Sequence, residues 1–297
     1  MHIPDGILSA PVLAGFGAAS AVGIALSARK AESTTDARRI PMLGVLGAFV
    51  FAAQMVNFPV GPGASGHLLG GALLAATIGP WAASIAMTAI LLIQALVFQD
   101  GGVLALAANI FNMAVLGVWV AWWPYRVLAQ AGKARWGIFT GAFLSVVLSA
   151  ALALTQVIIS GAAVTGALLW FCAAMFATTG LIEAAISVAA FEAIQRLEGT
   201  TTSVRRTPWP LLAASVAVLL AGVFFASQSP DVLEFFNTQS GAASRETHFL
   251  PALLPDYEWG ALPIEWMRKA AAGFAGLLLL YALSTFLIRF MPRRPQE

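Results

Sequence analysis

Residues 66–98, GHLLGGALLAATIGPWAASIAMTAILLIQALVF, decide how the chain is arranged. This apolar run either crosses a membrane once as a long helix or makes two helices that break at Gly79–Pro80, because proline removes a backbone donor and clashes with the preceding turn. The choice inverts the sidedness of every later segment. The positions of the basic residues therefore discriminate between the two arrangements.

The composition is that of an integral membrane protein. Of the 297 residues, 59% are hydrophobic and only 10% are charged, with a mean hydropathy of +0.83, whereas about a quarter of the residues of a soluble domain are charged. Cys172 is the single cysteine, which excludes a disulfide framework and a thiolate cluster. We expect an all-α polytopic membrane protein. The expected spans are residues 11–28, 40–57, 66–79, 81–98, 103–124, 136–159, 165–195, 208–226 and 268–290.

The distribution of basic residues favours this nine-span arrangement with a break at Gly79–Pro80. With the N-terminus outside, 13 of the 16 Lys and Arg residues fall in inner loops and three fall outside, whereas a single helix over 66–98 divides them into seven and nine. Basic residues concentrate on the cytoplasmic side of membrane proteins. We therefore expect the N-terminus and the long loop 227–265 on the outer face and the C-terminus in the cytoplasm.

The chain divides into two unequal parts. Residues 1–196 contain seven of the expected helices. The segment 197–207 is polar and resembles a cytoplasmic linker, with a helix-ending glycine and, directly after it, a proline. Residues 208–297 are expected to form a hairpin of two helices that carries the outer loop 227–265.

The opening stretch MHIPDGILS has the chemistry of a chelator. A free α-amine, the amide nitrogen of residue 2 and Nδ1 of its imidazole can close five- and six-membered rings in one plane around an ion, and square-planar nitrogen sites are typical of Ni(II) and Cu(II). The first Lys or Arg is Arg29, so the basic region of a signal peptide is missing. We expect an uncleaved N-terminus with Met1 and His2 as metal ligands.

His67 is the expected fourth ligand. It follows a loop rich in Pro and Gly within residues 57–71, NFPVGPGASGHLLGG. Glycines at 61, 63, 66, 70 and 71 would let the N-terminal segment approach closely. The pattern also predicts a helix that begins at His67, with Ser65 as its cap.

These motifs carry a resemblance to a known family. MHIPDGILS, NFPVGPGASGHLLGG and residues 106–117, LAANIFNMAVLG, resemble the substrate-binding membrane component (S component) of nickel/cobalt energy-coupling-factor (ECF) transporters, over about residues 1–196. The resemblance implies a seven-helix core and a metal held by the Met1 amine, the His2 amide nitrogen and imidazole, and His67. It also implies a location in the cell inner membrane and three partners, namely a transmembrane coupling (T) component and two cytoplasmic ATPases.

The C-terminal hairpin is similar to the small auxiliary subunit of the same transporters. SQSPDVLE at 227–234 resembles the SPDGLE signature of that subunit, and LPDYEWG at 254–260 resembles its later PDY segment. Val232 stands where the signature has glycine. If that glycine makes a turn with positive φ, valine would be strained there.

Several polar residues are candidates for supporting the metal ligands, although turns and simple helix–helix hydrogen bonds explain them equally well. These are Asp5, Asn57, Ser65, Asn109 and Asn112. Glu183 is an acid deep within an apolar span, and intramembrane acids are candidates for function. Because a proton-coupled mechanism would need more such groups, we expect Glu183 to be hydrogen-bonded and structural.

The sequence therefore predicts a component that captures Ni(II) at the outer face for ATP-driven uptake. It contains no Walker A motif, so ATP hydrolysis would belong to separate subunits. Co(II) as the transported ion is the nearest alternative. An intramembrane metalloenzyme would need an acid–base partner beside His67, and a metal-free scaffold would leave His2 and His67 incidental. The expected surroundings are the lipid bilayer and protein partners, with no nucleic acid.

Overall fold

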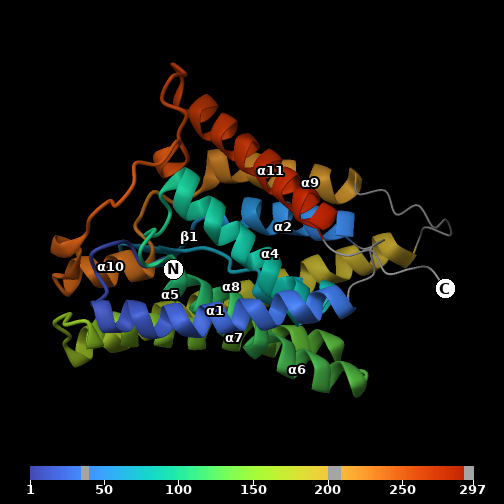
Figure 1. Cartoon of the computed structure of the whole chain (residues 1–297), viewed down its shortest axis with the longest axis horizontal. Coiled ribbons are helices and arrows are strands. Elements are labelled where there is room, and N and C mark those ends of the chain that lie inside the picture. Colours follow the sequence, from blue (N-terminus) through green and yellow to red (C-terminus); the bar gives the residue numbers. More distant parts are fainter. Residues whose placement is uncertain (35–39, 200–208, 291–297) are drawn as a thin grey trace.

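The computed structural model describes residues 1–34, 40–199 and 209–290, which form a bundle of long helices (Figure 1). The predicted linker 197–207 lies mostly outside these residues. Six of the basic residues assigned to inner loops also lie outside them: Arg38, Arg39, Arg205, Arg206, Arg293 and Arg294.

The helices occur in the predicted order. The longer ones are α1 (Ala10–Thr34), α2 (Ile40–Gln54), α4 (Pro80–Ile93), α6 (Val118–Gln130), α7 (Ala134–Ile159), α8 (Gly166–Gly199), α9 (Trp209–Phe225) and α11 (Glu265–Phe290). The shorter ones are α3 (Gly71–Ile78), α5 (Leu106–Asn109), α10 (Val232–Gln239), the 3₁₀ turns η4 (Ala242–Arg245) and η5 (Pro255–Tyr257), and the π-helical segments η2 (Gln94–Phe98) and η3 (Ile110–Gly117).

Five helical segments of the described chain are long and apolar enough to cross a membrane. They are Ala10–Ala31, Pro80–Phe98, Leu106–Gln130, Ala134–Ile159 and Gly166–Arg196, with Leu43–Gln54 and Trp209–Phe225 as shorter apolar helices. The all-α, multi-pass membrane class is therefore confirmed.

The helix break at Gly79–Pro80 is confirmed. Gly79 has φ 81° and ends α3, and Pro80 is the first residue of α4, where its missing N–H has no helical partner to lose. Because a helix rises about 1.5 Å per residue, the eight residues of α3 are too few to cross a bilayer. The third predicted span is thus only half helical.

The prediction of a helix that begins at His67 with Ser65 as its cap is wrong. Residues 58–66 instead form an antiparallel hairpin of β1 (Phe58–Gly61) and β2 (Ala64–Gly66). Residues 67–70 follow without helical structure, and α3 begins at Gly71. Gly70 has φ 72°, a left-handed conformation that glycine adopts without strain and that allows the chain to turn into the helix only there.

The two ends of the bundle differ. The N-terminus, the β hairpin and α10 lie together at one end, while the ends of α1 and α11 furthest along the chain point to the other (Figure 1). At the first end, the segment that follows α9 contacts this β hairpin. The Ser65 N–H donates to the Pro230 carbonyl at 2.8 Å, and the Ser227 N–H donates to the Asn57 carbonyl at 2.8 Å.

The C-terminal hairpin packs directly on the rest of the bundle. Helices α9 and α11 both contact α2, and α10 contacts α8 and β2. Val232, where strain was expected, is the first residue of α10 and is 1% exposed. It is not among the residues with positive φ. Position 232, where the family signature has glycine, therefore makes no left-handed turn in this protein. Valine fills this buried helical position without strain.

Candidate metal centre

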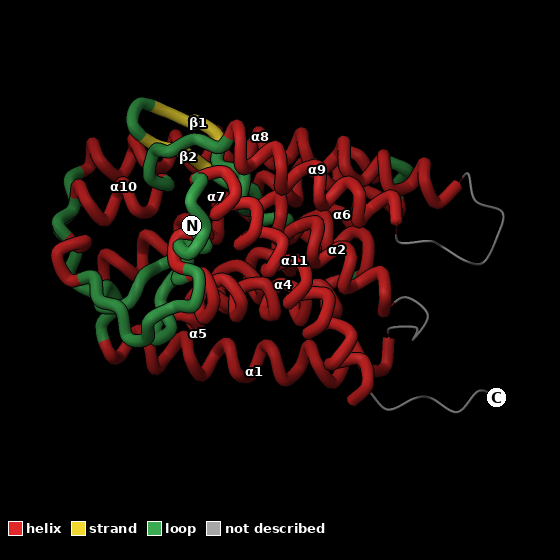
Figure 2. Tube along the Cα trace, turned by 90° about the horizontal axis from the view of Figure 1, so that it is seen from above, coloured by secondary structure: helices red, strands yellow, loops and turns green. Residues whose placement is uncertain are grey.

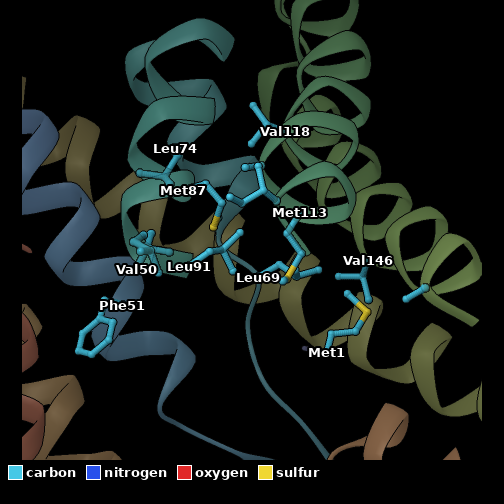
Figure 3. Packing of buried hydrophobic residues seen from close by; sticks show 14 of the residues in the cluster. Met1, Val50, Phe51, Leu69, Leu74, Met87, Leu91, Met113, Val118 and Val146 are labelled. Carbon is cyan, nitrogen blue, oxygen red and sulfur yellow. The ribbon is translucent and has the colours of Figure 1, made fainter. Parts of the chain in front are cut away.

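The first residues of the chain are inside the protein. Met1 is 7% exposed, and Ile3 and Ile7 are fully buried. Figure 2 shows the N-terminal segment running through the middle of the loop-rich end, beside β2 and α5, and Figure 3 shows the Met1 side chain next to Val146 of α7. Burying one large apolar side chain stabilises a protein by about 1.5–3 kcal/mol, so the two isoleucines anchor this segment.

Asp5 fixes the segment to the loop that precedes α5. Its Oδ1 accepts hydrogen bonds from the N–H groups of Leu104 (2.8 Å) and Ala105 (3.1 Å), and its Oδ2 accepts one from Val103 (3.0 Å). Asp5 is 3% exposed. The carboxylate thus satisfies the N–H groups of the three residues that lead into α5.

Two glycines of that loop allow the close approach. A Cβ atom on Gly102 would collide with the backbone and carboxylate of Asp5, and one on Gly101 would lie 3.0 Å from Cβ of His2. The Gly102 N–H also donates to the Ile3 carbonyl at 2.9 Å. The glycines expected to do this, at 61, 66 and 70, instead face side chains of α8, β1 and α2.

The two asparagines of the predicted support set behave differently. Asn109 holds the backbone of Ile3 from both sides: its Oδ1 accepts from the Ile3 N–H at 2.9 Å and its Nδ2 donates to the Ile3 carbonyl at 3.0 Å. Asn112 instead exchanges two hydrogen bonds of 2.8 Å with Gln156 of α7. Asn109 therefore positions the N-terminal segment, whereas Asn112 joins two helices.

His67 lies between β2 and α3 and is 8% exposed. Residues 69 and 70, just beyond it, are fixed by Glu183 of α8, which accepts from the Leu69 N–H at 2.5 Å and from the Gly70 N–H at 2.8 Å. Glu183 is fully buried. As expected, this intramembrane acid is hydrogen-bonded, and it holds the segment that carries His67.

The structure brings the Met1 amine and His67 together. The Met1 nitrogen lies 2.5 Å from Nε2 of His67. Adjacent nitrogens of a square-planar ion with bonds of about 2 Å lie about 2.8 Å apart, which is similar. The imidazole rings of His2 and His67 are parallel within 4°, with centroids 5.4 Å apart. The Met1 amine and Nε2 of His67 are therefore close enough to share an ion, and the His2 ring lies beside that of His67.

The His2 ring is held by an aspartate that the sequence analysis did not single out. Nδ1 of His2 lies 2.9 Å from Oδ1 of Asp100. The His2 side chain is 5% exposed, and its Nε2 is buried without a hydrogen-bond partner. Gln99 and Gly101 have positive φ, so the chain turns tightly around Asp100. A carboxylate behind a metal-binding histidine is a common way to fix the ring.

Asp231 is the second residue that was missed. Its Oδ2 accepts a hydrogen bond from the Met1 amine and lies 3.8 Å from Nε2 of His67. Asp231 belongs to SPDVLE, a segment recognised by its pattern but not connected with the metal. A local signal for such a contact does not exist, because 230 positions separate Asp231 from Met1.

The electrostatics of the cluster keep His67 and its carboxylates in the forms that bind cations. Burial lowers the pKa of His67, and the Met1 ammonium lowers it further, which favours the neutral imidazole. Burial raises the pKa of Asp231, but the Met1 ammonium and His67 outweigh it and hold that pKa well below its usual range. Against burial, His2 and Tyr257 likewise lower the pKa of Asp100.

A cavity of about 430 Å³ borders both histidines and several residues of the loop 227–265. Carboxylates dominate its charged lining, which consists of Asp100, Asp231, Glu234, Glu246, Asp256 and Lys269. Asn57 also lines it, and its carbonyl accepts from the Ser227 N–H. The Ser65 hydroxyl donates to the Ser229 carbonyl at 2.7 Å. The contacts of Asn57 and Ser65 thus fix the loop rather than His2 or His67.

Side chains alone do not make a metal site here. Among residues 1–34, 40–199 and 209–290, no three His, Cys, Asp or Glu side chains are arranged to hold an ion. A site with four protein ligands at this position therefore needs nitrogen atoms of the main chain.

Comparison with known proteins decides the family. Residues 2–201 match the family described as the cobalt uptake substrate-specific transmembrane region. The chain belongs to this family. Its members are metal transport components rather than enzymes, and the resemblance noted from MHIPDGILS and the His67 block is confirmed.

Members of this family include proteins that align along almost the whole chain. A protein of Archaeoglobus fulgidus named as a fused nickel transport protein is 30% identical over 98% of this chain and 99% of its own. One of Lactiplantibacillus plantarum with a similar name is 31% identical over 89% and 90%. A crystal structure described as a transition metal transporter has a TM-score of 0.55 and 31% identity, and covers 68% of this chain and 95% of its own.

Proposed function

We propose that the protein captures Ni(II) at the outer face of the cell membrane through four nitrogens. These are the Met1 amine, the amide nitrogen and Nδ1 of His2, and Nε2 of His67. The observation that carries the proposal is the 2.5 Å separation between the buried Met1 nitrogen and Nε2 of His67. A terminal amine is rarely buried, and here it lies beside a neutral imidazole.

Chelation through Nδ1 requires the His2 ring to turn. In the structure Nδ1 faces Asp100 and Nε2 is unpaired. A half-turn about the Cβ–Cγ bond directs Nδ1 inward and leaves the Nε2–H group as the donor nearer to Asp100. The metal-bound ring would then be oriented by a carboxylate behind it.

The choice of nickel rests on the ligand set and on the relatives. An amide nitrogen loses its proton to Ni(II) within a square plane of four nitrogens, which is a geometry typical of that ion. Two relatives that align along nearly the full chain are named for nickel transport. Co(II) remains the alternative within the same mechanism, since the family description names cobalt.

The remaining assignments follow the same resemblance and the charge distribution. We propose residues 1–196 as the S component and 208–297 as a fused auxiliary domain. The N-terminus lies outside and the C-terminus in the cytoplasm of the inner membrane. Delivery inward would follow docking on a T component driven by two ATPases. The acidic cavity would concentrate divalent cations beside the site.

Metal titration of the full chain, tagged only at the C-terminus, tests the proposal. The wild type is expected to bind one Ni(II) tightly, with the yellow, diamagnetic spectrum of a square-planar ion. Two residues added before Met1 would move the amine by up to about 7 Å, further than its distance from His67. This extension, His2→Ala and His67→Ala should each abolish tight binding, while His248→Ala serves as the control. Full affinity in the extended protein would refute the amine as a ligand.

A further inference from the structure

The structure connects both signature segments of the auxiliary domain to the N-terminal chelator. SPDVLE supplies Asp231, which bonds to the Met1 amine. PDY supplies Tyr257, whose hydroxyl donates to Oδ2 of Asp100 at 2.6 Å, while Oδ1 of Asp100 holds His2. Met1 thus contacts a carboxylate of the auxiliary domain, Asp231. His2 contacts Asp100, which the auxiliary domain holds through Tyr257.

Asp231 is held rigidly while one of its oxygens reaches the amine. It caps helix α10: its Oδ1 accepts from the Glu234 N–H at 2.8 Å. The carbonyl of the preceding residue, Pro230, accepts a hydrogen bond from the Ser65 N–H of β2. His67 directly follows β2 in the chain. The strand that positions His67 is therefore also the strand that positions Asp231.

Tyr257 is fixed as firmly on the other side. Its ring stacks on Phe98 with centroids 4.5 Å apart and planes 12° apart. Asp256 and Tyr257 both have positive φ, 55° and 58°, an unfavourable conformation for residues other than glycine that persists where surrounding contacts enforce it. The Leu254 N–H donates to the Val97 carbonyl at 2.8 Å. The loop therefore places the Tyr257 hydroxyl beside Asp100, and its backbone is strained at Asp256 and Tyr257.

We propose that the auxiliary domain presets the chelator for metal loading, with Asp231 and Tyr257 as positioning residues. Asp231 retains the Met1 amine beside His67 before the ion arrives, and Tyr257 orients Asp100 behind His2. Both carboxylates also place negative charge opposite the incoming dication. This inference rests on the proposed function and adds a role for the fused domain.

Asp231→Asn isolates the role of Asp231. Asparagine is as good a helix cap as aspartate, so α10 keeps its start while the charge on the amine is lost. Asp231→Ser, also a good cap, is a second variant in case the first folds poorly. Glu234→Gln is the matched control, because it removes one charge from the same helix and the same cavity.

Two measurements on the full chain with a C-terminal tag test the inference. The first is Ni(II) affinity by competition with a chromophoric chelator. The second is the rate at which a small acylating reagent modifies the Met1 amine of metal-free protein, read by mass spectrometry of the N-terminal peptide. Loss of a charge-assisted bond corresponds to about a 10- to 100-fold loss of affinity.

We expect Asp231→Asn to bind Ni(II) at least about 10-fold more weakly and to be acylated several-fold faster, and Asp231→Glu to recover part of both. Tyr257→Phe keeps the ring on Phe98, so it should weaken binding about 3- to 10-fold and leave amine acylation unchanged. The Glu234→Gln control should stay within about 2-fold of the wild type in both measurements.

The inference is overturned if the Asp231 variants match the control in both measurements, since Asp231 would then be only a helix cap. Tighter binding by Asp231→Asn would also overturn it, because Asp231 would then compete with the metal for the amine. A wild type that fails to bind Ni(II) refutes the proposed function, and acylation still reports whether Asp231 retains the amine.

Discussion

Replacing Asp5 with asparagine tests whether the docked N-terminal segment determines metal affinity. Asp5 touches none of the proposed ligand atoms, yet its two oxygens accept three N–H groups from residues 103–105. Asparagine has nearly the same shape but one acceptor oxygen. In the variant, the NH₂ group of the asparagine must face an N–H group that accepts no hydrogen bond and that is bonded to the carboxylate in the wild type.

The size of the effect follows from those bonds. One buried N–H left without a partner costs about 1–3 kcal/mol, and hydrogen bonds to charged groups contribute about 1.5–3 kcal/mol. A loss of about 2–3 kcal/mol in the docked state corresponds to about 30- to 150-fold. Burial of Ile3 and Ile7 still favours docking, and apparent affinity falls only with the docked fraction. We therefore expect Ni(II) binding to weaken about 10- to 100-fold.

The assay combines competition titration of Ni(II) with acylation of the Met1 amine in metal-free Asp5→Asn protein. Weaker binding and faster acylation should occur together, because both follow from undocking. The control is Asp256→Asn, which removes a cavity-lining charge at a left-handed position that asparagine tolerates. Unchanged affinity and acylation in Asp5→Asn would show that the three bonds do not hold the segment and would refute the reasoning.

Three further predictions concern the surroundings of the site. Glu183→Ala leaves the N–H groups of Leu69 and Gly70 unpaired and should lower the free energy of unfolding by about 2–5 kcal/mol, read as a lower melting temperature in detergent. Gly102→Ala places a methyl group against Asp5 and should weaken Ni(II) binding at least about 10-fold, whereas Gly260→Ala, with open space around it, should not. Because the His67 pKa is lowered, the unfolded chain takes up a proton below about pH 6.5 that the folded protein does not. Metal-free protein should therefore lose stability as the pH falls below that value, less so in His67→Gln, and equal pH dependence of thermal unfolding in the two would contradict a neutral His67.

The sequence predicts the parts of the fold that follow from local chemistry. Apolar runs and the Gly79–Pro80 pair identify the helices and their break, since both act within a few residues. The hairpin at 58–66 was not predicted because Pro59, Pro62 and three glycines read as an irregular loop. Its pairing depends on β2 being held from outside by Pro230, a long-range contact with no local pattern.

The same limit applies to the candidate site. Met1, His2 and His67 are identifiable because chelation dictates residue type and position, and their role as ligands stays a prediction. Asp100 and Asp231 carry no such mark, since an acid at the end of a span or in an outer loop is ordinarily solvated. Only the fold, which joins residues about 100 and 230 positions apart, gives them a partner.

The burial of the first residues has a consequence for biogenesis. The N-terminal segment is synthesised well before the residues that it contacts, at 100–109 and 231–247. Contacts so distant along the chain form late in folding. In the proposed orientation, residues 1–9 therefore cross the bilayer early and dock only when nearly all of the protein has been inserted.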